Sequence, residues 1–326
     1  MGAHFPQAGS MVQKKDRLVT LFGGGGFIGR YVAQALFARG MRVRVVQRDA
    51  RAAFFLKPLA SLGQVQFAAA DITRMEMVER CVKGSDAVIN LVGILRGNFD
   101  SIHRVGAGNI ARAAADAGAE ALVHISAIGA DPESASRYGR SKGEGEQAVR
   151  AAFPSATIVR PSVVFGQEDN FVNRFATMAR LLPVVPVIRG KWRMQPVHAA
   201  DVGRAIALAA LDPRSHGGRT YELGGPQTMT MLELNGYIAD RTGRGGKPIV
   251  EIPDALGGMI ARGGGWLPGA PITADQWLMM QTDSVPARGA PGFEAFGISP
   301  SPLAAVAEGW LTAYRRSGRF AAKSNY

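Results

Sequence analysis

Short, wholly apolar runs alternate with longer amphipathic stretches through the first half of the chain. Residues 17–22 (RLVTLF) predict a buried strand, and residues 27–39 predict a helix, because apolar side chains there recur every three to four positions. Strands that are apolar along their whole length are typical of a parallel sheet that helices cover on both faces. Further strands are expected at 42–47, 65–68, 86–92, 121–126 and 156–160, with helices at 74–83, 100–117 and 138–152 between them.

The alternation loosens after residue 160, where proline and glycine become frequent. We therefore predict an α/β fold: a Rossmann-type doubly wound parallel sheet in residues 17–165, and a smaller α-rich C-terminal lobe in residues 166–326 that is interleaved with the sheet. Residues 1–16 are expected to form a disordered tail. Helices of the second part are expected at 170–181, 200–211, 230–242, 274–282 and 302–316, and loops at 183–196, 212–227 and 243–271.

Composition and charge limit the cellular compartment and the kinds of partner that we expect. The chain has 326 residues, of which 47% are apolar, and its formal charge of +12 favours anionic partners. Cys81 is the only cysteine, which excludes an intramolecular disulfide and a thiolate metal cluster and favours a reducing compartment. No apolar run reaches the roughly 18 residues of a membrane span. Residues 1–16 lack the pattern of a signal or transit peptide, so we expect no such leader.

Four consecutive glycines lie between the first predicted strand and the first predicted helix. Gly23, Gly26 and Gly29 fit G-x-x-G-x-x-G, and Gly24, Gly26 and Gly29 fit G-x-G-x-x-G. In a strand–turn–helix context, such glycines permit a tight turn and let the backbone approach a pyrophosphate. The free N–H groups of the first helical turn, around Phe27 and Ile28, then face the anion. The cluster therefore predicts a dinucleotide-binding loop.

The end of the second strand bears on the choice of dinucleotide. An acidic residue about 20 positions after the glycine motif would bind a ribose 2′-hydroxyl, whereas Arg48 stands 19 residues after Gly29. A planar guanidinium suits a 2′-phosphate, so the sequence favours NADP(H) over NAD(H). The alternative is that Arg48 is a solvated loop residue and Asp49 binds the ribose.

Two further strand ends carry candidate binding residues. After the third strand, Asp71 could accept from an adenine amino group while Ile72 packs on the ring. Alternatively, Asp71 or Thr73 is the N-cap of the following helix. The segment 90–93 (NLVG) ends the fourth strand at the carboxyl edge, where its small residues suit backbone that passes under a ribose.

A tyrosine and a lysine four residues apart are candidates for acid–base chemistry. Tyr138 and Lys142 fit Y-x-x-x-K and lie on one face of a predicted helix. In this arrangement the lysine and a cationic nicotinamide are expected to lower the pKa of the phenol so that it can carry a proton. Ser126 lies at the end of the fifth strand, and the position two residues later is Ile128. The pair resembles that of the extended short-chain dehydrogenases/reductases, and this resemblance implies a substrate-polarising serine at position 128, for which Ser134 or Ser136 could substitute. His124 is expected to be a buried strand residue.

Three segments resemble one subgroup of the extended, atypical short-chain dehydrogenases/reductases. Residues 158–176 (IVRPSVVFGQEDNFVNRFA), 194–206 (MQPVHAADVGRAI) and 219–234 (RTYELGGPQTMTMLEL) are similar to the nucleotide-binding accessory subunit family of respiratory complex I, the alpha subcomplex subunit nine type. The likeness runs from about residue 17 to 320, and RPSVVFGQEDNF is its most specific part. The resemblance implies a tightly bound NADPH and a role in assembly and stability, with little or no turnover.

The resemblance also implies a set of cofactor-binding residues. The residues expected to bind the phosphates are Gly23, Gly26, Phe27, Ile28, Gly29 and Arg48. The residues expected to bind the adenine are Asp71 and Ile72. Those expected at the ribose and nicotinamide are Leu91, Val92, Gly93, Ser126, Tyr138, Lys142, Pro161 and Val163. Tyr138 and Lys142 would be catalytic only if the protein is active, because they can remain as ribose ligands after catalysis is lost.

Basic clusters in the C-terminal part suggest where partners bind. Residues 174–204 carry six basic residues against Asp201, and 315–323 carry four with no acid. We expect contact with complex I peripheral-arm subunits or with an anionic membrane surface, and no nucleic acid, since no recognition motif accompanies the charge. The expected location is the cytoplasmic face of a bacterial inner membrane, with the mitochondrial matrix face as the alternative. The competing functions are an NADP-dependent reductase or epimerase and a redox-sensing regulator.

Overall fold

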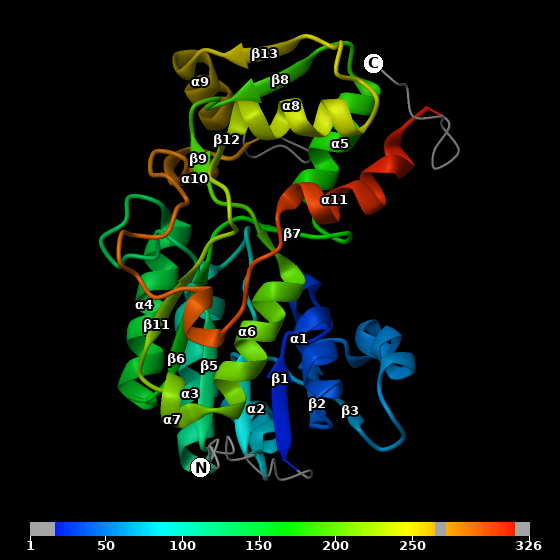
Figure 1. Cartoon of the computed structure of the whole chain (residues 1–326). Coiled ribbons are helices and arrows are strands. Elements are labelled where there is room, and N and C mark those ends of the chain that lie inside the picture. The colour runs from blue at the N-terminus through cyan, green and yellow to red at the C-terminus, as the bar shows by residue number, and fades with distance from the viewer. Residues whose placement is uncertain (1–16, 265–271, 317–326) are drawn as a thin grey trace, which may run out of the picture.

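A seven-stranded parallel sheet forms the centre of the molecule (Figure 1). The computed structural model describes residues 17–264 and 272–316, so the tail expected at 1–16 lies outside the described residues. The sheet has the order β3-β2-β1-β4-β5-β6-β11. Its strands are β1 (Leu18–Phe22), β2 (Arg42–Gln47), β3 (Val65–Ala69), β4 (Ala87–Asn90), β5 (Ala121–Ile125), β6 (Thr157–Pro161) and β11 (Thr220–Leu223).

Strand order in this sheet reverses between β1 and β4. β1 pairs with β2 on one side, through Val19 and Val43, and with β4 on the other, through Val19 and Ala87. Ligands of such sheets bind in the crevice outside the carboxyl ends of the strands where the order reverses. The predicted Rossmann-type doubly wound sheet is therefore confirmed, and its switch point adjoins the glycine loop.

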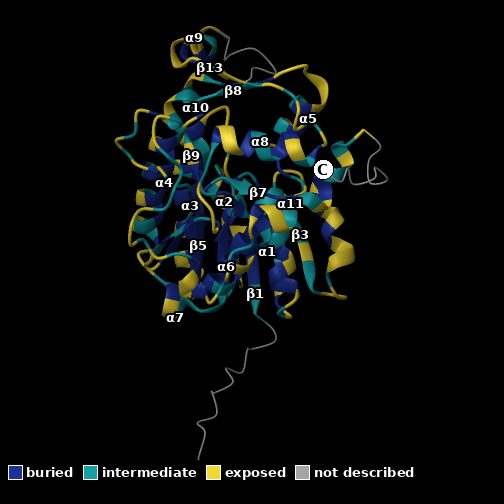
Figure 2. Cartoon of the chain, turned by 45° about the horizontal axis from the view of Figure 1, so that its top comes forward, coloured by how far each residue is buried: buried dark blue, intermediate teal, exposed yellow. Residues whose placement is uncertain are grey.

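Helices cover both faces of the sheet. Helices α1 (Phe27–Phe37) and α6 (Ala199–Leu211) cover one face, where their apolar residues form a core with β1, β2 and β5. The other face is covered by α2 (Met75–Val82), α3 (Ala107–Asp116) and α4 (Arg137–Ala152). Burial is accordingly concentrated in the strands and in the sheet-facing sides of the helices (Figure 2).

Helix α6 lies very close to α1 because Gly203 has no side chain. A Cβ atom at Gly203 would come within 2.8 Å of the Tyr31 carbonyl carbon. This contact fixes a helix from the second half of the chain against the helix that follows the glycine loop. Strand β11 also comes from beyond residue 165, so the second half contributes to the central unit, and the division at 165 stays a prediction.

The C-terminal lobe has a core of its own, above the carboxyl ends of the strands in Figure 1. Its core includes Phe165, Met194, Leu234 and Trp310. Its helices are α5 (Val172–Leu181), α8 (Met231–Arg241), α9 (Asp254–Gly264), α10 (Ala274–Met279) and α11 (Leu303–Leu311). Two-stranded sheets pair β7 (Val164–Phe165) with β10 (Val197–His198), β8 (Val185–Ile188) with β13 (Ile249–Ile252), and β9 (Arg193–Met194) with β12 (Met229–Thr230).

Several segments expected to be loops are regular structure. The expected loop 212–227 contains the short helix α7 (Pro213–His216) and the edge strand β11, whose burial alternates along only four residues. The expected loop 243–271 contains β13 and α9, and 183–196 contains β8 and β9. These elements are short or polar, so their periodicity is weak, and they form through tertiary pairing. Residues 50–59, for which no element was predicted, form the 3₁₀ helix η1 (Ala50–Leu59).

None of the helices in the described ranges 17–264 and 272–316 combines the length and the apolar character that crossing a bilayer requires.

The close packing of α6 on α1 predicts opposite effects of the same substitution at two helical glycines. Gly203→Ala should lower the free energy of unfolding by about 1–3 kcal/mol, because its methyl group overpacks the helix contact. Gly309→Ala is the matched control on α11, since no described atom lies within 4 Å of its added Cβ. It should stabilise the protein by about 0.5–1 kcal/mol through reduced backbone entropy of the unfolded chain. Urea unfolding measures the free energy of unfolding of both variants. An unchanged value in Gly203→Ala would contradict the packing argument.

Candidate functional site

The glycine loop makes a turn that tolerates no side chains. Gly23 has a φ of 79°, and its Cβ would lie 3.2 Å from the carbonyl carbon of Leu91. A Cβ at Gly29 would lie 2.4 Å from the Gly23 oxygen. The Gly26 amide donates to that same oxygen at 3.0 Å. The loop is therefore pressed between α1 and the end of β4, and the structure brings together four of the predicted residues.

The first turn of α1 presents backbone donors at the switch point. Gly26 is the N-cap and has no side chain to satisfy the amides of Phe27 and Ile28. The first turn also contains no acidic residue. Such amides, aligned with the positive end of the helix dipole, bind phosphate groups. The segment Leu91–Val92 lies directly across the loop, and its contact with the ribose and nicotinamide stays a prediction.

At the end of β2, Arg48 is exposed and Asp49 has a structural role. One oxygen of the Asp49 carboxylate accepts from the Arg51 amide at 3.0 Å and so caps η1. The Gln47 side chain lies over Gly25 and donates to the Asp49 carbonyl at 2.6 Å. Arg48 is thus the exposed cation at this strand end.

After β3, Asp71 forms a local turn. Its Oδ1 accepts from the amide and the hydroxyl of Thr73, at 2.9 and 2.8 Å. These bonds lower the pKa of the Asp71 carboxyl, and the nearby charges of Arg48 and Arg74 lower it further. Helix α2 has Arg74 as its N-cap, so the expectation that Asp71 or Thr73 caps this helix is wrong.

Ile72 is part of the core. It is 5% exposed, and its Cδ1 atom lies 2.5 Å from the position of a Cβ at Gly106. Its carbonyl accepts from the Asn109 side chain at 3.0 Å. Its contact with an adenine ring stays a prediction.

At the end of β4, Asn90 joins two neighbouring strand ends. Its Oδ1 accepts from the Val92 amide at 3.0 Å, and its Nδ2 donates to Nδ1 of His124 at 3.1 Å. The His124 proton therefore resides on Nε2. His124 is 1% exposed, and burial lowers the pKa of its imidazole, so it is the buried strand residue that was expected.

A second buried histidine, which no sequence pattern indicated, joins the loop after β4 to helix α4. Nε2 of His103 accepts from the Ile94 amide at 3.0 Å, and its Nδ1 contacts the Ser141 hydroxyl at 2.8 Å. Because Nε2 is an acceptor, Nδ1 carries the proton and donates it to Ser141. Ser141 in turn donates to the carbonyl of Tyr138 at 2.8 Å. Burial, with a smaller effect of the Lys142 charge, lowers the pKa of His103 to about 3.

Tyr138 and Lys142 lie on α4 as predicted. The Lys142 ammonium donates to the carbonyl of Ile125 at 2.7 Å. Burial lowers the pKa of Lys142 to about 8, and the Glu146 charge opposes this effect. Burial raises the pKa of Tyr138 to about 12. In the protein alone, burial sets the pKa of the phenol, and the lowering expected from the lysine together with a bound nicotinamide stays a prediction.

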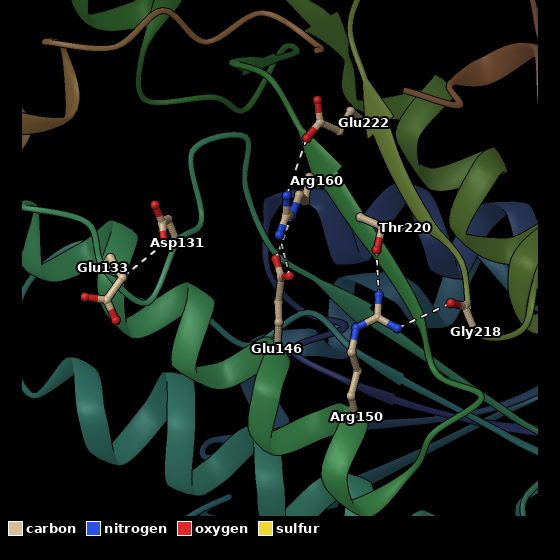
Figure 3. A network of polar contacts seen from close by, with 8 residues as sticks. All are labelled: Asp131, Glu133, Glu146, Arg150, Arg160, Gly218, Thr220 and Glu222. Atoms are coloured by element: carbon tan, nitrogen blue, oxygen red, sulfur yellow. Dashed lines mark hydrogen bonds and ion pairs between the residues drawn. The ribbon is translucent and has the colours of Figure 1, made fainter. Parts of the chain in front are cut away.

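Helix α4 is fastened to the sheet by a partly buried network of ion pairs and hydrogen bonds (Figure 3). Arg160 on β6 donates to both oxygens of Glu146 on α4, at 2.8 and 2.7 Å, and lies 3.5 Å from Glu222 on β11. Arg150, also on α4, donates to the Thr220 hydroxyl at 2.5 Å. A bidentate guanidinium–carboxylate pair fixes both partners, so the Tyr138 helix is held rigidly over β6.

Ser126 presents a buried hydroxyl at the same edge of the sheet. Among the described residues, none hydrogen-bonds its Oγ, although its amide donates to Val159 at 2.7 Å. Buried polar atoms are nearly always paired, so this hydroxyl fits a site that a bound ligand completes. Ile128 donates its amide to Pro161 at 3.2 Å and is half-buried. Position 128, where the resemblance implies a substrate-polarising serine, therefore carries an apolar side chain.

The remaining predicted residues flank this edge. Gly93 is exposed after β4, and the position of its Cβ would lie 3.7 Å from Nε2 of His103. Val163 follows Pro161, and its carbonyl accepts from the Val197 amide at 3.0 Å. The ligand contacts expected of Gly93, Pro161 and Val163 stay predictions.

Comparison with known proteins gives matches along most of the chain. The model of the NAD dependent epimerase/dehydratase family matches residues 19–224. The alpha subcomplex subunit 9 of mitochondrial NADH dehydrogenase (ubiquinone) 1 from Rattus norvegicus is 36% identical over 297 residues, covering 88% of this chain and 77% of that protein. The mitochondrial NADH-ubiquinone oxidoreductase 40 kDa subunit of Neurospora crassa is 31% identical over 310 residues, covering 92% and 80%.

Two further proteins are similar over a smaller share or at lower identity. A ceramide reductase of Caulobacter vibrioides is 32% identical over 200 residues, covering 60% of this chain and 62% of that protein. The crystal structure of the Citrobacter sp. triphenylmethane reductase complexed with NADP(H) has a TM-score of 0.68 and 20% identity, covering 87% and 96%. The structural likeness supports the fold.

The buried neutral histidines predict a loss of stability in acid. Unfolded His103 would bind a proton near pH 6.5, whereas the folded side chain does so only near pH 3. Between pH 6.5 and about pH 3, the unfolded state therefore binds more protons than the folded state. The free energy of unfolding falls as the pH is lowered through this range. His103→Gln should reduce the slope of unfolding free energy against pH by up to about 1.4 kcal/mol per pH unit. Urea unfolding from pH 6 to 4 measures this slope. An equal slope in His103→Gln and wild type would contradict the assignment of His103 as a buried neutral residue.

Proposed function

The chain belongs to the NAD dependent epimerase/dehydratase family and, within it, to the family of the alpha subcomplex subunit 9 of respiratory complex I, and we propose that it is an NADP(H)-binding accessory subunit with little or no turnover. The single observation that carries the proposal is the combination of a complete dinucleotide cradle with an incomplete catalytic set. The cradle is formed by the glycine loop and the N-terminus of α1. The catalytic set lacks a hydroxyl at Ile128.

The residues present fit a nicotinamide dinucleotide. The amides of Phe27 and Ile28 would bind the pyrophosphate, because Gly26 leaves them without a side-chain cap. The buried Ser126 hydroxyl, unpaired among the described residues, would gain a partner from the nicotinamide half. The bound nucleotide would supply hydride chemistry in an active relative. In this protein its role is to complete and stabilise the fold around the switch point.

Arg48 supports NADP(H) over NAD(H). It is the exposed cation at the end of β2, close enough to Asp71 for its charge to lower the pKa of that carboxyl. Asp49, the alternative ribose ligand, uses one carboxylate oxygen to cap η1. A guanidinium binds a 2′-phosphate by charge-assisted hydrogen bonds, whereas a 2′-hydroxyl would gain less from it.

The residues around Tyr138 support retention of the nucleotide rather than its use. A phenol with a pKa near 12 gives up its proton poorly at neutral pH. The Lys142 ammonium is directed to the Ile125 carbonyl instead of assisting that phenol. Ile128 offers no hydrogen bond to a substrate carbonyl. Tyr138 and Lys142 are therefore proposed as nucleotide ligands.

The partners proposed are peripheral-arm subunits of complex I and an anionic membrane surface. The basic end of the lobe gathers cations from α5, from the loop after α8 and from the C-terminal turn: Arg180, Arg244, Lys247, Arg315 and Arg316. Arg244 donates to the carbonyl of Tyr314 at 2.8 Å, and burial, followed by the like charges of Arg316 and Arg180, lowers its pKa. Leu181, 72% exposed, lies beside them.

Such a surface suits acidic protein or lipid headgroups, and each cation near an anionic leaflet contributes on the order of 1 kcal/mol. The proposed location is the cytoplasmic face of a bacterial inner membrane. The mitochondrial matrix face is the alternative, since the names of the relatives call them mitochondrial. Nucleic acid is not proposed as a partner.

A second candidate is an NADP-dependent reductase or epimerase. It is favoured by the Tyr138–Lys142 pair on α4 and by the 32% identity to a ceramide reductase over 60% of the chain. An active enzyme would need a donor for the substrate carbonyl in place of Ile128. Consumption of NADPH with a carbonyl substrate would distinguish this candidate from the first.

The choice of nucleotide is tested by removing the cation at the end of β2. Arg48→Gln should weaken NADPH binding by roughly ten- to a hundredfold, the effect of losing a charge-assisted hydrogen bond, and leave NADH binding unchanged. Arg51→Gln is the matched control, because this exposed arginine lies in η1, where its amide, not its side chain, contacts Asp49. Calorimetric titration measures the affinities. Equal losses for both nucleotides in Arg48→Gln would contradict the assignment to the 2′-phosphate.

The role in the respiratory complex is tested by purification from native membranes. We expect the tagged chain to co-purify with complex I subunits and to carry NADP(H), identified by mass spectrometry after denaturation. Tyr138→Phe should keep its partners and most of its nucleotide, because the phenol is one of several proposed nucleotide ligands and its proton is not used. A soluble monomer that consumes NADPH with a small carbonyl substrate, and loses this activity in Tyr138→Phe, would overturn the proposal in favour of the reductase.

A further inference from the structure

A glutamate at the start of the C-terminal lobe is bound to the helix that follows the glycine loop. Glu168 forms an ion pair with Arg30 and accepts from the hydroxyl of Tyr31 at 2.7 Å. Both partners lie in the second turn of α1, directly after Gly29. The neighbouring Asp169 is 4% exposed and accepts from four backbone amides, which fixes the loop that carries Glu168.

An aspartate from the same lobe is bound to the helix that carries Tyr138. The Asp275 carboxylate accepts from the amides of Arg137 and Tyr138, at 2.6 and 3.1 Å, and from the Ser136 hydroxyl at 3.2 Å. Asp275 lies in the first turn of α10, whose N-terminus is closed by a capping box of Thr273 and Gln276. A carboxylate at the N-terminus of α4 also interacts favourably with the helix dipole.

The segment after α10 ties this contact to the rest of the molecule. Residues 280–291 are bonded to the lobe, where the Trp192 indole donates to Thr282 at 2.8 Å and Arg193 pairs with Asp283 at 2.7 Å. They are also bonded to the central sheet, where the Ala287 amide donates to Glu222 at 2.7 Å. Movement of the lobe away from the sheet would therefore pull directly on Asp275.

From these contacts we propose that Glu168 and Asp275 form a two-point clamp that closes the C-terminal lobe over the nucleotide and controls its exchange. The inference rests on the proposed function, because the helices held by the clamp are those that flank the proposed nucleotide site. Helix α1 would bind the pyrophosphate and α4 the nicotinamide half. Release of the dinucleotide from both ends requires the lobe to separate from both helices, and each separation breaks the contacts of one carboxylate.

Each half of the clamp is a charge-assisted contact on the surface of the central unit. The side chain of Glu168 is 30% exposed, so water reaches the contact and can replace it when the lobe moves. Such a contact is strong enough to keep the lobe closed and weak enough to open without unfolding either unit. The clamp thus makes residence of the nucleotide long without making its binding irreversible.

The experiment measures release of NADPH from the full chain. Protein loaded with NADPH is mixed with excess NADP⁺, and the fall of bound-NADPH fluorescence gives the release rate. Glu168→Gln and Asp275→Asn should each release NADPH roughly tenfold faster than wild type, the effect expected from losing one charge-assisted contact, and the double variant faster than either. Asp254→Asn is the control, because this lobe aspartate pairs with Arg189 of the same lobe.

Asp275→Glu is the second variant, because it keeps the carboxylate. It should release NADPH more slowly than Asp275→Asn, and equal rates for these two variants would contradict the clamp. If wild-type protein retains NADPH, and Glu168→Gln and Asp275→Asn release it at the wild-type rate, the clamp alone is overturned. Wild-type protein that takes up no NADPH overturns the proposed function and the clamp together.

Discussion

The arrangement of the site depends on the close approach of α1 to the loop that precedes it. With a Cβ at Gly29, the helix would collide with the carbonyl of Gly23, and with one at Gly23 the loop would press on Leu91. The missing side chains set the N-terminus of α1 beside the end of β4, where strand order reverses. A second close approach, at Gly203, holds α6 on the far side of the same helix. Helix α1 is thus fixed from both sides, and its amides point into the crevice.

The other side of the crevice is formed by a helix that several contacts hold in place. Arg160 pins α4 to the sheet, and His103 joins it to the loop after β4 through Ser141. This rigid helix carries Tyr138 and Lys142. The Lys142 ammonium binds a backbone carbonyl, and position 128 carries an isoleucine. We propose that such a rigid helix suits long-term retention of a ligand.

Local patterns in the sequence predicted the central unit well. The glycine loop, the apolar strands and the amphipathic helices each carry a short-range signal, and the doubly wound sheet followed from their order. Strand β11 was missed because four residues at a sheet edge carry little periodicity. The Lys142 contact was missed because spacing places this residue on the same helical face as Tyr138 without showing that its ammonium bonds to the Ile125 carbonyl. Partnerships such as Asp275 with α4 join residues about 140 positions apart, and no local pattern encodes them.

We propose that the chain keeps its dinucleotide without using it. The test follows the 340 nm absorbance of the NADPH-loaded protein while it is incubated with native membranes, whose lipids and quinones include carbonyl compounds. We expect a constant absorbance over many hours, equal to that of the Tyr138→Phe protein. A decay of the absorbance in wild type that is abolished in Tyr138→Phe would show turnover and overturn the proposal.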